Sequence, residues 1–65
     1  MIKNLYNVCG LDEYDNIFKG TCVADDIVRA IELFRIRGFI VESVSKLSKV
    51  TKDYPNRVVS LKYQK

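Results

Sequence analysis

The chain contains no histidine and no tryptophan among its 65 residues. Without histidine, the commonest general base and the commonest neutral metal ligand are missing, so Ser-His-Asp and Cys-His catalysis are excluded within this chain. Its two cysteines are too few for a disulfide scaffold or for a structural zinc site with four Cys or His ligands. The three glycines are isolated, so no glycine-rich phosphate loop exists. These absences predict a protein that is not an enzyme, holds no cofactor or metal, and has no small-molecule substrate.

Long apolar runs are also missing. No stretch approaches the roughly 18 consecutive apolar residues that indicate a membrane span. No basic segment followed by an apolar run opens the chain, which argues against a signal peptide. We therefore expect a cytoplasmic protein with reduced thiols and no membrane partner.

The overall composition is that of a folded globular protein, with 48% hydrophobic and 29% charged residues. We expect residues 1–65 to form one small domain. A chain of this size buries only about 60% of the surface that its unfolded form exposes. Small domains commonly gain stability from a disulfide, a metal or association with another chain, and here association is the source that the composition leaves open.

A β-hairpin is predicted near the start of the chain. Two short apolar segments, residues 5–11 and 17–23, flank the polar turn cluster DEYDN. A two-residue turn at Asp15-Asn16 would place Cys9 opposite Cys22, because Asn and Asp tolerate positive φ. One face would then hold Leu5, Cys9, Leu11, Phe18 and Cys22, and the other Tyr6, Val8, Tyr14, Ile17, Thr21 and Val23.

The next segment predicts an amphipathic helix. Asp25 is a suitable N-cap, Asp26 would lie in the first turn near the positive end of the helix dipole, and Gly38 is a natural residue for the position after the helix. The apolar spacing of i, i+3, i+4 and i+7 predicts one stripe that faces a core. The stripe consists of Ile27, Ala30, Ile31 and Phe34.

Two further strands are predicted at residues 40–50 and 58–63, with a turn at TKDYPNR around Pro55. As a second hairpin, they would turn Ile40, Val44, Val50, Val59, Leu61 and Tyr63 inward, and Leu47, Lys49, Val58, Ser60 and Lys62 outward. The resulting fold class is α+β, with the element order ββαββ. We expect a four-stranded antiparallel sheet in the order 2-1-3-4, with one helix packed on one face.

This fold would leave more apolar residues than one helix can cover. The interpretation without a functional role is a surface with scattered apolar residues, which is normal for folded proteins. The functional interpretation is a contact surface for a second copy or another protein. It predicts a small non-enzymatic interaction or regulatory module, either a homodimer or a protein that occludes a partner. The candidate interface residues are Val28, Leu33, Ile36, Tyr6, Val8 and Ile17.

The charge is unevenly distributed. Residues 1–32 carry a net charge of −3 and residues 33–65 carry +6. Part of this asymmetry is explained by acidic residues at the start of the helix and basic residues at its end. The rest supports an alternative function, a nucleic-acid-binding module that uses the basic C-terminal hairpin. Its candidate contacts are Lys46, Lys49, Lys52, Tyr54, Arg57 and Lys62, and the competing interpretation is a solvated face.

The segments VADDIVRAIELF and RGFIVESV add a resemblance at the level of pattern. A hairpin, a small residue with a cap, an Ala-Ile helix, a glycine and a strand resemble many small accessory proteins of bacterial phages and mobile elements. The resemblance covers residues 5–45, and the matching residues are Ala24, Asp25, Ala30, Ile31, Phe34, Gly38 and Val41. It implies a fold and a genomic setting, and it carries no active site.

Overall fold

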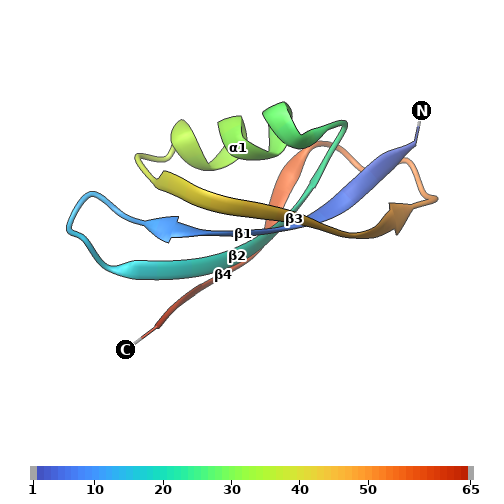
Figure 1. Ribbon diagram of the computed structural model, residues 1–65. Coiled ribbons are helices and arrows are strands. Elements are labelled where there is room, and N and C mark those ends of the chain that lie inside the picture. The colour runs from blue at the N-terminus through green and yellow to red at the C-terminus, as the bar shows by residue number, and fades with distance from the viewer. Residues whose placement is uncertain (1, 65) are drawn as a thin grey trace.

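The computed structural model describes residues 2–64 and confirms the α+β fold with the order ββαββ. Its elements are β1 (Lys3–Leu11), β2 (Ile17–Ala24), α1 (Ile27–Arg35), β3 (Ile40–Val50) and β4 (Arg57–Tyr63). The strands form one antiparallel sheet, and α1 lies across one of its faces (Figure 1). No helix within residues 2–64 has the length and apolar character needed to cross a membrane.

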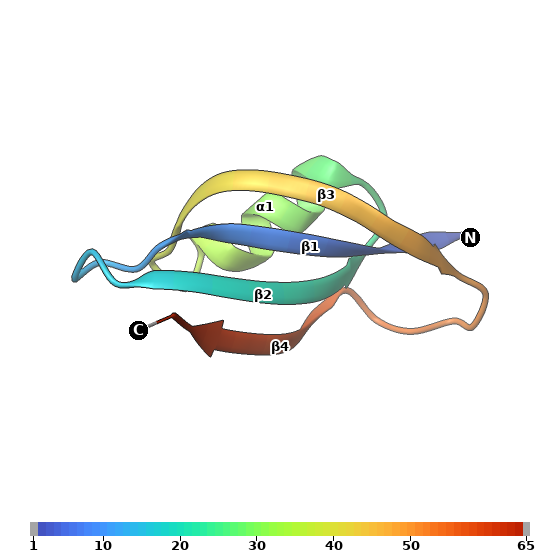
Figure 2. The ribbon, with the colours of Figure 1, turned by 60° about the horizontal axis from the view of Figure 1, so that its bottom comes forward.

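The strand order is β3-β1-β2-β4, so the predicted order is wrong at the last strand. Instead of forming a hairpin with β3, β4 pairs with β2, and residues 51–56 cross one end of the sheet (Figure 2). The Asn56 side chain donates a 3.0 Å hydrogen bond to Asp25, which ties this crossing to the end of β2. The segment is long enough either to close a hairpin or to span three strand spacings of roughly 5 Å each. Its turn residues therefore predict a reversal of the chain without specifying the pairing partner.

The hairpin of β1 and β2 forms with a different register from the predicted one. Leu11 lies opposite Ile17, and Cys9 lies opposite Lys19. Cys22 pairs with Tyr6, so Cys9 and Cys22 face opposite sides of the sheet. The predicted cysteine pairing is therefore wrong. The predicted division is right within each strand, but the faces of the two strands are wrongly matched, since Cys22 shares a face with Tyr6 rather than with Cys9.

The loop of this hairpin explains the shift in register. It extends from Asp12 to Asn16, because the Asp12 carboxylate accepts hydrogen bonds from the backbone N–H groups of Tyr14 (2.8 Å) and Asn16 (2.9 Å). The Asn16 side chain donates a third hydrogen bond, at 3.1 Å. Asp15 adopts a φ of 63°, as Asp and Asn do more readily than most residues. A side chain that organises its own loop thus replaces the tight two-residue turn.

Register shifts interrupt both outer strand pairs. The ladder of β1 with β3 shifts twice, and the ladder of β2 with β4 shifts once. At each shift one strand carries an extra residue, so alternate residues no longer face alternate sides. Val41 and Val44 both lie on the helix side for this reason, opposite Gly10 and Val8.

These shifts overturn part of the predicted inner face. Ile40 and Val50, which were expected inside, pair with residues of β1 that face away from the helix. Val58, which was expected outside, lies opposite Cys22 on the helix side. A strict period of two cannot anticipate this arrangement, because the shifts depend on the partner strand.

The ends of α1 follow local rules. The N-cap is Asp26 rather than the predicted Asp25, since the Asp26 side chain accepts a 2.8 Å hydrogen bond from the Arg29 N–H. At the other end, Gly38 has a φ of +88°, as predicted for the residue that follows a helix. The Phe39 N–H donates to the Phe34 carbonyl at 3.2 Å, which completes a Schellman motif.

The core lies between α1 and the sheet. Three phenylalanines meet there: the Phe18 and Phe34 rings stack at 5.5 Å between centroids, and Phe39 lies 4.5 Å from Phe18. Tyr6 and Val8 are 6% and 0% exposed in the same core. These two residues were expected at an interface, and the structure corrects that prediction. The register places them on the face that the helix covers.

Candidate functional site

The face of the sheet that α1 leaves uncovered is the main candidate site (Figure 2). We call it the open face. Residues directly opposite each other on neighbouring strands share a face, so the pairing defines four rows that reach β2 and a fifth, Lys3 with Val50, that is confined to β1 and β3. No acidic residue occupies any of these positions. The rows that reach β2 are Ile40, Leu11 and Ile17; Ser43, Cys9, Lys19 and Lys62; Ser45, Asn7, Thr21 and Ser60; and Ser48, Leu5, Val23 and Arg57.

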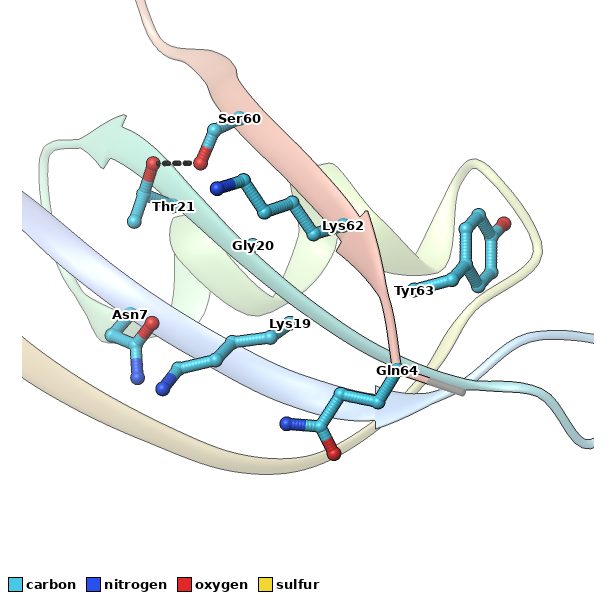
Figure 3. A pocket seen from close by; sticks show the side chains of 8 residues that line it. All are labelled: Asn7, Lys19, Gly20, Thr21, Ser60, Lys62, Tyr63 and Gln64. Atoms are coloured by element: carbon cyan, nitrogen blue, oxygen red, sulfur yellow. Dashed lines mark hydrogen bonds between the residues drawn. The ribbon is translucent and has the colours of Figure 1, made fainter.

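A hollow of about 400 Å³ lies over β2 and β4 on this face, and we call it the lysine groove (Figure 3). Lys19 and Lys62, direct cross-strand partners, extend their side chains along it. The Tyr63 side chain turns away from the others, as its pairing with Phe18 on the helix side requires. The complete lining is Asn7, Lys19, Gly20, Thr21, Ser60, Lys62, Tyr63 and Gln64.

The two lysines have no acidic partner among residues 2–64. The ion pairs formed in that range join Lys3 to Asp25 at 3.9 Å and Arg29 to Glu32 at 3.6 Å. Like charges placed directly opposite on paired strands repel each other and destabilise the sheet. The groove therefore presents two cations whose charge is balanced by no neighbouring side chain of the described chain.

The floor of the groove contains a polar pair of side chains and a glycine. Thr21 Oγ1 and Ser60 Oγ are joined by a 2.7 Å hydrogen bond in which either oxygen could be the donor. This bond uses one hydroxyl hydrogen and leaves the other for a ligand. At Gly20, a Cβ would lie 2.8 Å from the Ser60 carbonyl oxygen and 3.0 Å from the Phe34 ring. The glycine thus lets the core ring pack directly beneath the groove.

One end of the open face is apolar. Ile40, Leu11 and Ile17 form a continuous row across β3, β1 and β2 at the hairpin end, next to the row that contains the lysines. Ile17 is 52% exposed and Ile40 is 59% exposed. We call these three residues the apolar row. Of its members, the sequence predicted only Ile17 as an interface residue.

The predicted interface on the helix is retained in part. Val28 and Ile36 are 65% and 77% exposed, while Leu33 is half-buried and packs against the core. Val28 and Ile36 lie two turns apart, and Glu32 lies between them on the outer side of α1. The outer face of the helix therefore carries two separate apolar side chains rather than a patch.

The residues predicted to contact nucleic acid are divided between the two sides of the sheet. Lys62 and Arg57 lie on the open face. Lys46 and Lys49 pair with Tyr6 and Asn4, so they lie on the helix side. The predicted outward direction of Lys49 is therefore wrong.

The remaining two predicted contacts, Lys52 and Tyr54, belong to the segment that crosses the end of the sheet. Tyr54 lies 6.0 Å beneath the Arg57 guanidinium, within the range of a cation–π contact. No sequence signal identified Lys19 as a site residue, because its neighbour Lys62 reaches it only through the unpredicted pairing of β2 with β4.

The two cysteines have different environments. Cys22 is fully buried in the core, and burial raises the pKa of its thiol to about 11. Its thiol is therefore protonated and unreactive at neutral pH. Cys9 is half-buried on the open face, next to Lys19. The register thus separates the only two thiols and gives them no shared chemistry.

The carboxyl group of Asp12 is the other group with a shifted pKa. Its burial alone would raise the pKa. Hydrogen bonds from the backbone and side chain of Asn16 and from the Tyr14 N–H outweigh burial, with a further contribution from the Tyr63 hydroxyl, and hold the pKa below its ordinary value. The ionised carboxylate is thus the form that organises the loop.

Comparison with known proteins gives no match for this chain among protein-family models, curated proteins or solved structures. Any functional argument therefore rests on the open face and on the outer side of the helix.

Proposed function

We propose that the protein is a small non-enzymatic protein-interaction module whose contact surface is the open face. The observation that carries this proposal is the apolar row, which lies beside Lys19 and Lys62, two cations without an acidic partner among residues 2–64. Apolar area supplies the driving force for association, and the adjacent charges select the partner. The matching partner is a protein surface on which carboxylates or other acidic groups flank an apolar cluster.

The charge of the open face favours a different protein over a second copy. A symmetric dimer formed through this face would place together two surfaces that each carry Lys19, Lys62 and Arg57. No acidic residue at the paired positions could neutralise them. Because like charges across an interface are unfavourable, the homodimer predicted as one alternative is the weaker one for this surface.

The sheet edges are less suited to binding than its open face. The edge strand β3 contains two register shifts and carries Glu42, Lys46 and Lys49. The other edge, β4, contains one shift and carries Arg57 and Lys62. Shifts and charged side chains on edges oppose the addition of another strand. The resemblance to phage and mobile-element accessory proteins fits a role in which the open face covers a protein of a bacterial host.

The proposal is tested with two matched double variants. Ile17→Ser with Ile40→Ser removes two exposed apolar side chains from the open face. Val28→Ser with Ile36→Ser removes two from the helix. We expect the wild-type protein to be a monomer by light scattering over a concentration series. A partner captured by the wild type should be held about tenfold more weakly by the open-face variant and equally well by the helix variant.

The reverse pattern would overturn this assignment. A concentration-stable dimer that only the helix variant dissociates would move the interface to α1 and make self-association the function. Equal binding of a partner by the wild type and both variants would exclude both surfaces.

Nucleic-acid binding is a second candidate, favoured by the presence of Lys19, Lys62 and Arg57 on one face. Against it, none of the paired positions on that face is aromatic, so no base-stacking platform exists there. This candidate predicts binding of DNA or RNA that weakens steeply as salt increases. An absence of binding at low salt would remove it.

A further inference from the structure

We propose that the lysine groove is an oxyanion-binding site that takes a phosphate or carboxylate group from an acidic segment of the partner. This inference deepens the proposed function, because the partner would present the anion. The chemistry of the groove can nevertheless be tested without any partner. The two claims are also tested through different residues, since the groove is lined by Lys19 and Lys62 and the apolar row contains neither.

The lysine pair has an electrostatic cost for the stability of the folded protein. Lys19 and Lys62 occupy directly opposed positions on β2 and β4. Such a pair destabilises the sheet unless a negative charge lies between or above the two amines. Residues 2–64 supply no acidic side chain to either of them. An anion in the groove would convert this repulsion into two charge-assisted hydrogen bonds.

Hydrogen-bond donors from several residues line the groove beside the lysine pair. Each lysine amine carries three N–H donors and no acceptor. Beside them lie the Asn7 and Gln64 amides and the Thr21–Ser60 hydroxyl pair, which retains one free hydroxyl hydrogen. The Asn7 amide makes only a long contact with the Cys9 sulfur, at 4.0 Å. The groove thus combines several hydrogen-bond donors with two positive charges, a combination that suits an oxyanion.

The size of the groove also fits an oxyanion. The hollow of about 400 Å³ is at the small end of the range of ligand pockets, roughly 300–1,000 Å³. This space is sufficient for one phosphate or carboxylate group and the chain that carries it. Its lining has no aromatic side chain turned inward, since Tyr63 points away (Figure 3). The groove is therefore built for a charged group rather than for a stacked base.

The experiment begins with inorganic phosphate as the probe. Backbone amide resonances of the ¹⁵N-labelled protein are followed while phosphate is added, against sodium chloride at equal ionic strength. We expect phosphate-specific shifts at Lys19, Gly20 and Thr21, and none on α1. Two matched double variants follow: Lys19→Gln with Lys62→Gln, and Lys46→Gln with Lys49→Gln. Each removes two positive charges, but the second pair lies on the helix side.

The expected result is a loss confined to the groove. The groove variant should bind phosphate about tenfold more weakly than the wild type, while the helix-side variant should change by less than about twofold. Phosphate should raise the thermal unfolding midpoint of the wild type and of the helix-side variant, but not that of the groove variant. The groove variant should itself unfold no earlier than the wild type, so lost binding cannot be attributed to lost folding.

Three longer probes then distinguish the sources of the anion: a glutamate-rich peptide, a phosphoserine peptide and a single-stranded oligothymidylate. Tighter binding of either peptide than of the oligonucleotide supports an acidic protein segment. Tighter binding of the oligonucleotide overturns that source and favours a nucleic-acid backbone. The site itself is overturned if phosphate causes no specific shift, or if both lysine variants lose equal affinity. Neither result would affect the apolar row, which is tested by the serine variants.

Discussion

The two faces of one four-stranded sheet have opposite characters in this protein. The helix side holds the stacked Phe18 and Phe34 rings and the other fully buried side chains. The open side holds Lys19, Lys62 and several serine, threonine and asparagine side chains. The two faces are made by alternating residues of the same strands. The core and the proposed binding surface therefore occupy separate sets of residues, so stability and binding should respond to separate substitutions.

The largest effect is expected on the helix side. Phe34→Ala should destabilise the protein by about 3–5 kcal/mol, because the ring is fully buried and packs against two other rings. A domain of this length has a total stability of only about 3–10 kcal/mol, so much of this variant should be unfolded. Ile36→Ala, on the exposed side of the same helix, should change stability by less than about 0.5 kcal/mol. Urea unfolding followed by circular dichroism measures both, and equal losses would contradict the assigned core.

Gly20→Ala should have the next largest effect, because this residue lies between the Phe34 ring of the core and the groove on the open face. Its Cβ would contact the Phe34 ring on one side and the Ser60 carbonyl oxygen of β4. Overpacking of this kind costs about 1–3 kcal/mol, more than the roughly 0.5–1 kcal/mol that an alanine gains over glycine in a strand. Unfolding in urea again provides the measurement. A variant as stable as the wild type would show that Phe34 and β4 yield without resistance.

The loop of the first hairpin should make stability depend on pH. The pKa of Asp12 is lowered in the folded protein, so its contribution is fully present above the ordinary carboxyl pKa of about 3.9 and is lost as pH falls through the lower folded value. Asp12→Asn should remove this acid sensitivity and lower the unfolding midpoint at pH 7. Thermal unfolding between pH 7 and pH 2 checks this. Asp15→Asn is the control, because its side chain is exposed and asparagine tolerates the same positive φ. Identical pH profiles for Asp12→Asn and the wild type would contradict the role of the carboxylate.

The smallest effect should have the opposite sign. Lys19→Gln removes one member of the opposed lysine pair and should stabilise the protein by roughly 0.2–1 kcal/mol at low salt. The gain should shrink as salt is added, because exposed charges are screened. Lys46→Gln is the matched control, since its partner across the ladder is the uncharged Tyr6. Destabilisation by Lys19→Gln would mean that the pair is already neutralised in the free protein, and would weaken the contrast between the two faces.

The helix was the most accurately predicted element. Its final glycine and an aspartate cap are local features, and the structure confirms them with a shift of one residue at the cap. The predicted apolar stripe is confirmed at Ala30 and Phe34 but is wrong at Ile27, which is 48% exposed because it lies in the first turn, at the margin of the core. Asp25 is not the cap because it contacts Lys3 and Asn56, which are distant in sequence. The existence of the four strands was equally local, because apolar β-branched segments bounded by turn residues need no knowledge of their partners.

The candidate site could be predicted only in pieces. Lys62 was identified as a basic residue on an outer strand face, and Ile17 as an exposed residue of the hairpin. Their neighbours Lys19 and Leu11 were not, because both neighbourhoods depend on strand register. A change of register by an odd number of residues exchanges the two faces of a strand. This is why Tyr6 and Val8 lie in the core instead of at an interface.

The sequence by itself therefore determined the fold class, the order of the elements and the helix with its Ala30 and Phe34 core positions and its terminal glycine. These depend on periodicity and capping within short segments. Only the tertiary structure decided which strands are neighbours, where the ladders shift, and which side chains share a face. The Asp12 loop set the register of β1 with β2, and the crossing of residues 51–56 carried β4 to the edge beside β2. The open face depends on the register that this loop sets, and the lysine groove depends in addition on the long-range pairing of β4 with β2, which no local pattern specifies.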